Sequence, residues 1–107
     1  MARISTHVLD IARGVPAAGI TVELYSVDHL IQSAITNSDG RTDPPLLIGD
    51  RIAAGSYELI FHVEGYLNTR TPFFDRITIR FTVSDEHGNY HVPLLLAPNG
   101  YSTYRGS

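Results

Sequence analysis

The stretch YELIFHV, residues 57–63, has an apolar or aromatic side chain at every odd-numbered position, which is a period of two. This period predicts a β-strand with one buried face, because successive side chains of a strand point to opposite sides. The same alternation recurs in residues 77–83, ITIRFTV, and in residues 20–27, ITVELYSV. Turn-forming sequences separate these stretches and helical periodicity is nearly absent, which is typical of an all-β sandwich or barrel.

Two turns and one short helix are predicted beside these strands. GVPAAG at residues 14–19 and NSDG at residues 37–40 are turn sequences, because Asp and Asn tolerate the left-handed backbone and glycine adopts it freely. Arg41 therefore emerges directly from a turn. Residues 64–70 alternate too little for a strand, so we expect one or two helical turns that Pro72 ends.

The composition is that of a globular chain. We expect residues 1–107 to form one domain, because this length supports a single modest core. The net charge is -3, and all eight basic residues are arginines. Nucleic acids and anionic membranes both select for a clustered basic excess, so we expect neither as a partner. No apolar run approaches the roughly 20 residues that span a bilayer.

The chain contains no cysteine, which excludes disulfides, thiolate metal sites and a cysteine nucleophile. The five histidines lack compact ligand spacing, so we expect no metal and no cofactor. Met1 leads into a strand-like pattern without the features of a secretory leader. We therefore expect a cytoplasmic location, with a periplasmic or peroxisomal form left open.

Alternation places two histidines away from the core. In residues 4–10 the apolar face is formed by even-numbered positions, so His7 points outward. In residues 90–96 the even-numbered positions are again apolar, which leaves His91 and Pro93 on the opposite face. A strand that contains proline lacks one hydrogen-bond donor, as is typical beside a shaped binding surface. Either histidine alone is most simply a solvated surface residue.

The final stretch YSTYRGS, residues 101–107, alternates as well. Its odd-numbered positions share one side, so we expect Arg105 and Ser107 to project together from a terminal strand. If this strand and those of His7 and His91 are neighbours in one sheet, two imidazoles, a guanidinium and a hydroxyl gather on one outer face.

Four motifs, in order, resemble those of the 5-hydroxyisourate hydrolases, also called transthyretin-related proteins. They are STHVLD with GVPA within residues 5–17, NSDGR at 37–41, HVPLLL at 91–96 and YSTYRGS at 101–107. The closing YRGS is the most specific, because transthyretin shares the fold but lacks this ending and transports hormone. The chain departs from the family pattern at Ala97, Asn89 and the pair Asp75-Arg76, which leaves the motif positions untouched.

The resemblance implies an all-β, transthyretin-like (prealbumin) β-sandwich of two four-stranded sheets with one short helix. It implies a homotetramer, a dimer of dimers, with active sites between the dimers. Outward-facing His7, His91 and Ser107 fit that arrangement, because a neighbouring subunit is needed to exclude water from them. The implied enzyme hydrolyses 5-hydroxyisourate to 2-oxo-4-hydroxy-4-carboxy-5-ureidoimidazoline in urate degradation.

The resemblance also implies catalytic roles for His7, Arg41, His91 and Ser107. Imidazole titrates near neutral pH, so the two histidines can deprotonate a water and protonate the leaving nitrogen. Which histidine is the base stays open. The arginine holds the flat ring and offsets charge on the attacked carbonyl. Ser107 orients a histidine or the substrate through its hydroxyl or terminal carboxylate.

The implied substrate-binding residues are His7, Arg41, Tyr104, Arg105 and Ser107. Two other functions remain open, namely a non-catalytic small-molecule carrier like transthyretin and a plain β-sandwich interaction module. Decay of 5-hydroxyisourate separates the hydrolase from the carrier. Deletion of residues 104–107 separates it from the interaction module, which should scarcely notice the loss.

Overall fold

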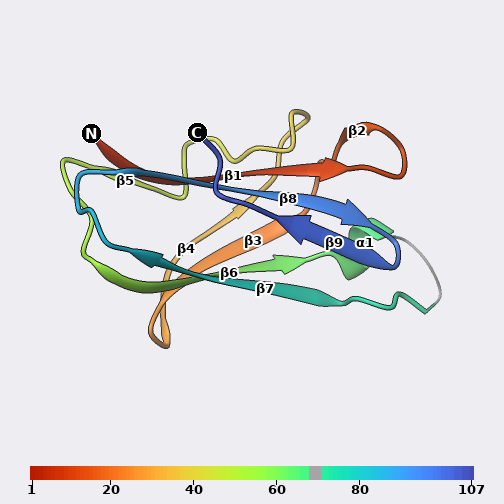
Figure 1. The fold of residues 1–107 in the computed structure, drawn as a ribbon. Coiled ribbons are helices and arrows are strands. Elements are labelled where there is room, and N and C mark those ends of the chain that lie inside the picture. Colours follow the sequence, from red (N-terminus) through yellow and green to blue (C-terminus); the bar gives the residue numbers. More distant parts are fainter. Residues whose placement is uncertain (68–70) are drawn as a thin grey trace.

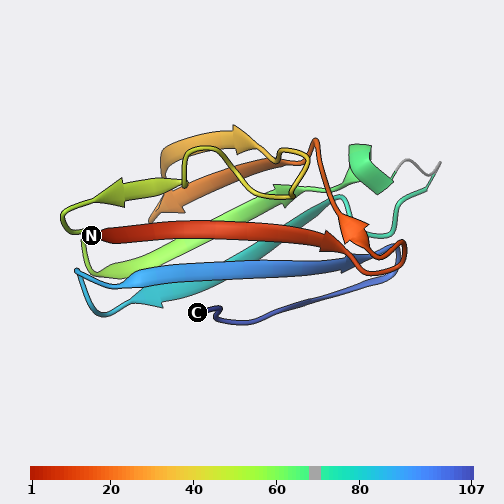
Figure 2. The same cartoon turned by 90° about the horizontal axis from the view of Figure 1, so that it is seen from above.

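The computed structural model describes residues 1–67 and 71–107. Two sheets pack face to face, with a one-turn helix at one end (Figures 1 and 2). One sheet has four antiparallel strands in the order β4 (His29–Ile35), β3 (Thr21–Ser26), β6 (Gly55–His62) and β7 (Arg76–Val83).

The other sheet has the order β2 (Val15–Pro16), β1 (Ala2–Asp10), β8 (Asn89–Ala97) and β9 (Gly100–Thr103). Strands β1 and β8 are parallel, whereas β8 and β9 are antiparallel. A fifth strand, β5 (Leu47–Gly49), also pairs with β1. The transthyretin-like sandwich is confirmed, with five strands in this sheet because β5 and β2 pair with opposite ends of β1.

The core between the sheets follows the predicted alternation. The odd-numbered residues of 57–63 and the even-numbered residues of 20–24 are buried. Near the two ends of β7, Ile77 and Val83 are buried, whereas Ile79 and Phe81 in its middle are only half-buried. The two half-buried residues line a groove between β7 and β9, the edge strands of the two sheets, which leaves them partly open to solvent.

The predicted turn at residues 37–40 is confirmed, since the Gly40 N–H donates to the Asn37 carbonyl at 2.9 Å. Helix α1 (Glu64–Leu67) confirms the first part of the predicted helix, and the remainder of that prediction, at 68–70, lies outside the described residues. Within residues 1–67 and 71–107, no helix is long and apolar enough to cross a membrane.

Candidate active site on the outer face of one sheet

Parallel pairing of β1 with β8 brings the two outward histidines to one face of the sheet. The register aligns Ser5 with His91 and His7 with Pro93. Both imidazoles are half-buried, whereas the alternating residues of the same strands fill the core. The predicted outward orientation of both histidines is therefore confirmed.

The turn at residues 37–40 delivers Arg41 to the edge of β1. Arg41 forms an isolated antiparallel bridge with His7, and the Val8 N–H donates to the Gly40 carbonyl at 2.8 Å. Gly40 has a φ of 75°, and a Cβ there would collide with the Val8 carbonyl. Only glycine allows this close approach of the turn to β1. The hydrogen bond that it permits keeps Arg41 beside His7.

His91 is held along both edges of its ring. Its Nδ1 lies 2.9 Å from the Ser5 hydroxyl oxygen. On the opposite edge, Gly106 packs against ring carbon Cδ2, where a Cβ would clash, and the Gly106 N–H donates to the His91 carbonyl at 2.7 Å. The tail of the chain is thereby fastened directly onto a predicted catalytic side chain.

A depression of about 460 Å³ opens at this point of the face. Its lining is mainly polar and comprises Arg3, Ser5, Arg41, Asn89, His91 and Ser107. Burial lowers the pKa of His91, and the nearby Arg41 and His7 lower it further. The imidazole is therefore neutral at neutral pH, as a general base must be. The guanidinium groups of Arg3 and Arg41, which both line the depression, suit a flat, electron-rich ligand.

Three of the four predicted catalytic residues, Arg41, His91 and Ser107, line this depression. The fourth, His7, lies beside it, bridged to Arg41 and near enough to His91 to lower its pKa. No cluster of three or more His, Cys, Asp or Glu able to hold a metal ion occurs in the part of the chain that the structure describes.

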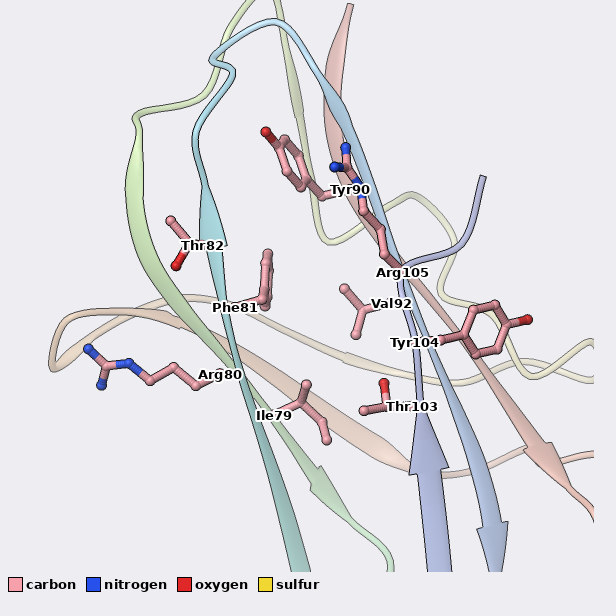
Figure 3. A pocket seen from close by; sticks show the side chains of 9 residues that line it. All are labelled: Ile79, Arg80, Phe81, Thr82, Tyr90, Val92, Thr103, Tyr104 and Arg105. Atoms are coloured by element: carbon pink, nitrogen blue, oxygen red, sulfur yellow. The ribbon is translucent and has the colours of Figure 1, made fainter.

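Arg105 does not share a side with Ser107, contrary to the expectation from alternation. Its guanidinium lies over the Tyr90 ring, 4.5 Å from the centroid, and its Nη2 donates to the Asn89 carbonyl at 3.3 Å. In Figure 3 the Arg105 side chain reaches Tyr90, while the Tyr104 ring points away from Phe81. Both tail residues line the groove between β7 and β9 instead of the histidine depression.

Pro93 of β8 interrupts the pairing of this strand with the tail. Pairing of β9 with β8 ends at Thr103 and resumes only as a single bridge between His91 and Gly106. Pro93 has no N–H to donate to the tail. Its carbonyl accepts a hydrogen bond from the Thr103 hydroxyl at 2.7 Å. The register is the same on both sides of this break, because Leu94 pairs with Thr103 and His91 with Gly106. Arg105 and Ser107 are therefore separated by their own contacts, since Arg105 lies over Tyr90 whereas Ser107 lines the depression.

Sequence reasoning did not single out Ser5, Arg3 or Asn89, which also line the depression. A signal was present for the first two, because both occupy odd-numbered positions of β1 and so share the face of His7. The same signal marks Asn89, which lies two residues before His91 in β8, although the sequence singled it out only as a departure from the family pattern.

A model of the HIUase/Transthyretin family matches residues 4–106. The 5-hydroxyisourate hydrolase of Deinococcus radiodurans is 50% identical, covering 97% of this chain and 95% of that protein. The solved structure of the Klebsiella pneumoniae 5-hydroxyisourate hydrolase has a TM-score of 0.88 and 36% identity, with all of both chains covered. Transthyretin from Sparus aurata has a TM-score of 0.83 and 25% identity, covering 96% of this chain and 95% of that one.

The higher identity to the hydrolases confirms the predicted resemblance and the prediction of an enzyme. The chain belongs to the HIUase/Transthyretin family.

Proposed function

We propose that the protein hydrolyses 5-hydroxyisourate to 2-oxo-4-hydroxy-4-carboxy-5-ureidoimidazoline, a step of urate degradation. The observation that carries the proposal is the gathering of Arg41, His91 and Ser107 around one depression, with His7 beside it. The relatives supply the identity of the substrate, since curated proteins 38–50% identical to this chain are named 5-hydroxyisourate hydrolase.

The reaction adds one water across a cyclic amide. An imidazole takes a proton from the water as its oxygen bonds to the lactam carbonyl carbon. The ring C–N bond then breaks, its electron pair goes to nitrogen, and a proton from an imidazolium completes the NH2 of the ureido group. His7 and His91 are the groups available for both transfers, and neither transfer requires a cofactor.

Arg41 stabilises the negative charge that develops on the attacked carbonyl oxygen, a task suited to a fixed donor in a site poor in water. Its planar guanidinium also matches the flat ring of the substrate. Ser107, which also lines the depression, orients the substrate or His91. Arg105 holds the tail through its contacts with Tyr90 and the Asn89 carbonyl, whereas Tyr104 is exposed at the neighbouring groove.

The active assembly is proposed to be a homotetramer built from two dimers. Arg41 and Ser107 are exposed in the single chain, so water reaches the depression freely. A second subunit over this face would exclude that water and strengthen every charge interaction inside. Light scattering coupled to size-exclusion chromatography measures the assembly directly, and a monomer at all concentrations would contradict the proposal.

The decay of freshly made 5-hydroxyisourate, followed by ultraviolet absorbance, tests the proposed reaction. Arg41→Ala should slow turnover on the order of 10²-fold or more, because one charge-stabilising donor is lost. His7→Asn and His91→Asn should leave a folded protein with almost no activity. An uncatalysed rate of decay with the wild-type protein would refute the reaction, and near-normal turnover in either histidine variant would refute its role.

Two matched controls separate these effects from general damage. His29→Asn replaces an exposed histidine at the start of β4, and Arg51→Ala replaces an arginine whose side chain is 73% exposed. Both should retain wild-type activity. The similarity to Sparus aurata transthyretin keeps a carrier as the second candidate, and binding of the substrate without accelerated decay would favour it.

A further inference from the structure

Ser5 carries a hydroxyl that the reaction as described does not use. Parallel pairing of β1 and β8 sets Ser5 directly beside His91, and its Oγ lies 2.9 Å from the ring Nδ1. Ser5 is half-buried and lines the same depression as His91. The hydroxyl is therefore placed to decide how the imidazole presents its nitrogens.

The ring of His91 cannot turn over without losing its contacts. One edge carries Nδ1 and meets Ser5, whereas the other edge carries Cδ2 and packs against the Gly106 backbone. These two atoms flank the ring carbon attached to Cβ, so Nε2 lies at the far end of the ring. Nε2 is consequently the nitrogen left for the depression that Arg41 and Ser107 line.

The two arginines that line the depression favour an unprotonated Nε2. The charged and titratable groups around His91 are Arg3 and His7 of β1, Arg41 after the turn, and Ser107 at the end of the chain. Guanidinium groups only donate hydrogen bonds, so they are better satisfied by a lone pair on Nε2 of His91 than by an N–H there. A serine hydroxyl accepts as readily as it donates, so it can accept from Nδ1–H.

The charge state of His91 agrees with this arrangement. Burial, Arg41 and His7 all lower its pKa, so the ring carries a single proton at neutral pH. That proton resides on one of the two nitrogens, and the partner of the other nitrogen selects which.

We propose that Ser5 is a positioning residue that keeps the proton of His91 on Nδ1, so that the free Nε2 is the general base for the attacking water. The inference rests on the proposed hydrolysis and assigns the base between its two histidines. Nε2 takes a proton from water as the oxygen–carbon bond forms. Nε2 then gives a proton to the leaving nitrogen of the substrate as the substrate's carbon–nitrogen bond breaks. This transfer restores the starting tautomer of His91.

Steady-state kinetics on 5-hydroxyisourate test the role of Ser5. Ser5→Ala should lower kcat on the order of 10-fold, part of what a general base supplies, with KM nearly unchanged. Ser5→Thr keeps the hydroxyl and should restore most of kcat. Ser33→Ala, at an exposed position of β4, is the matched control and should behave as wild type. An unchanged kcat in Ser5→Ala would overturn the inference.

Nitrogen NMR of protein labelled with ¹⁵N-histidine tests the tautomer without any substrate. His91 is assigned by the signals missing from His91→Asn. We expect a protonated Nδ1 and a free Nε2 in the wild type, and a mixture of tautomers in Ser5→Ala. A protonated Nε2 in the wild type would overturn the inference, even if Ser5→Ala does not fold. Wild-type protein that fails to accelerate decay refutes the hydrolysis itself, and the spectrum then still decides the tautomer.

Discussion

Gly106 lies where any larger residue would collide with the ring of His91. Gly40 occupies the equivalent place beside β1, where a Cβ would collide with the Val8 carbonyl. Glycine backbone thus approaches the proposed catalytic His91 in one case and the residue after the proposed catalytic His7 in the other. These glycines thereby position Ser107 and Arg41, the residues that follow them in the chain.

Gly106→Ala should lower kcat/KM on the order of 10²-fold while leaving the fold intact. The added methyl displaces either the tail or the His91 ring, and a displacement of about 1 Å can cost that much in rate. Gly100→Ala is the matched control, because a Cβ at Gly100 meets nothing within 4 Å. Equal activity of the two variants would show that the contact with His91 is unimportant.

At the level of single elements, the β3–β4 hairpin contains a residue in an unfavourable conformation. Ser26 pairs with His29, which leaves a two-residue loop of Val27 and Asp28. Val27 has a φ of 53° and is 77% exposed, so a β-branched residue occupies the left-handed region with little packing in return. The first loop position of such hairpins favours glycine.

Val27→Gly should raise the free energy of unfolding by about 0.5–1 kcal/mol, because relief of the strained backbone outweighs the entropy of glycine. Urea denaturation measures the change. Val15→Gly makes the same replacement in β2, where φ is not positive, and should destabilise instead. Stabilisation by both replacements, or by neither, would contradict the role of the strained turn.

Helix α1 is tied to the end of β1 by a buried carboxylate. The Tyr66 hydroxyl donates to Asp10 at 2.6 Å, and the backbone N–H groups of Ala12 and Arg13 donate to the same carboxylate. Burial by itself raises the pKa of Asp10, but these hydrogen bonds outweigh it and bring the pKa below its ordinary value. The ionised carboxylate therefore stabilises the folded state.

Tyr66→Phe should lower the free energy of unfolding by about 1.5–3 kcal/mol at neutral pH, the usual contribution of a hydrogen bond to a charged group. Because the folded-state pKa of Asp10 is depressed, its contribution is present above the unfolded value of about 3.9 and is lost as the pH falls through the folded value. The difference between wild type and variant should therefore shrink below about pH 4. A difference independent of pH down to acid unfolding would contradict this account.

At the scale of the whole molecule, the site lies on the outside of the sandwich. The core fills the space between the sheets, so the outer face of the β1–β8 sheet is where a polar depression can form without disturbing it. An open site of this kind is shielded from water only by another molecule. Activity and assembly should consequently be linked.

Specific activity should fall on dilution once the concentration drops below the dissociation constant of the assembly, because mass action then favours single chains. Turnover per chain and mass by light scattering, measured over the same dilution series, should change together. His91→Asn serves as control, since it should dissociate as the wild type does without activity at any concentration. Constant turnover per chain across dissociation would show that one chain suffices.

The sequence by itself determined the faces of the strands. Alternation is a local property of the chain, so it placed His7 and His91 outward and the even-numbered residues of β1 in the core without knowledge of any partner. The turn before Arg41 was equally local, because it depends on the backbone preferences of four consecutive residues.

Only the tertiary structure decided which of these faces meet. Ser5 and His91 are 86 positions apart, and their contact follows from the register of two parallel strands, which no local pattern encodes. The separation of Arg105 from Ser107 likewise depends on distant residues. The Arg105 guanidinium lies over the Tyr90 ring, whereas the bridge between Gly106 and His91 holds Ser107 at the histidine depression, and the local pattern of the tail encodes neither contact.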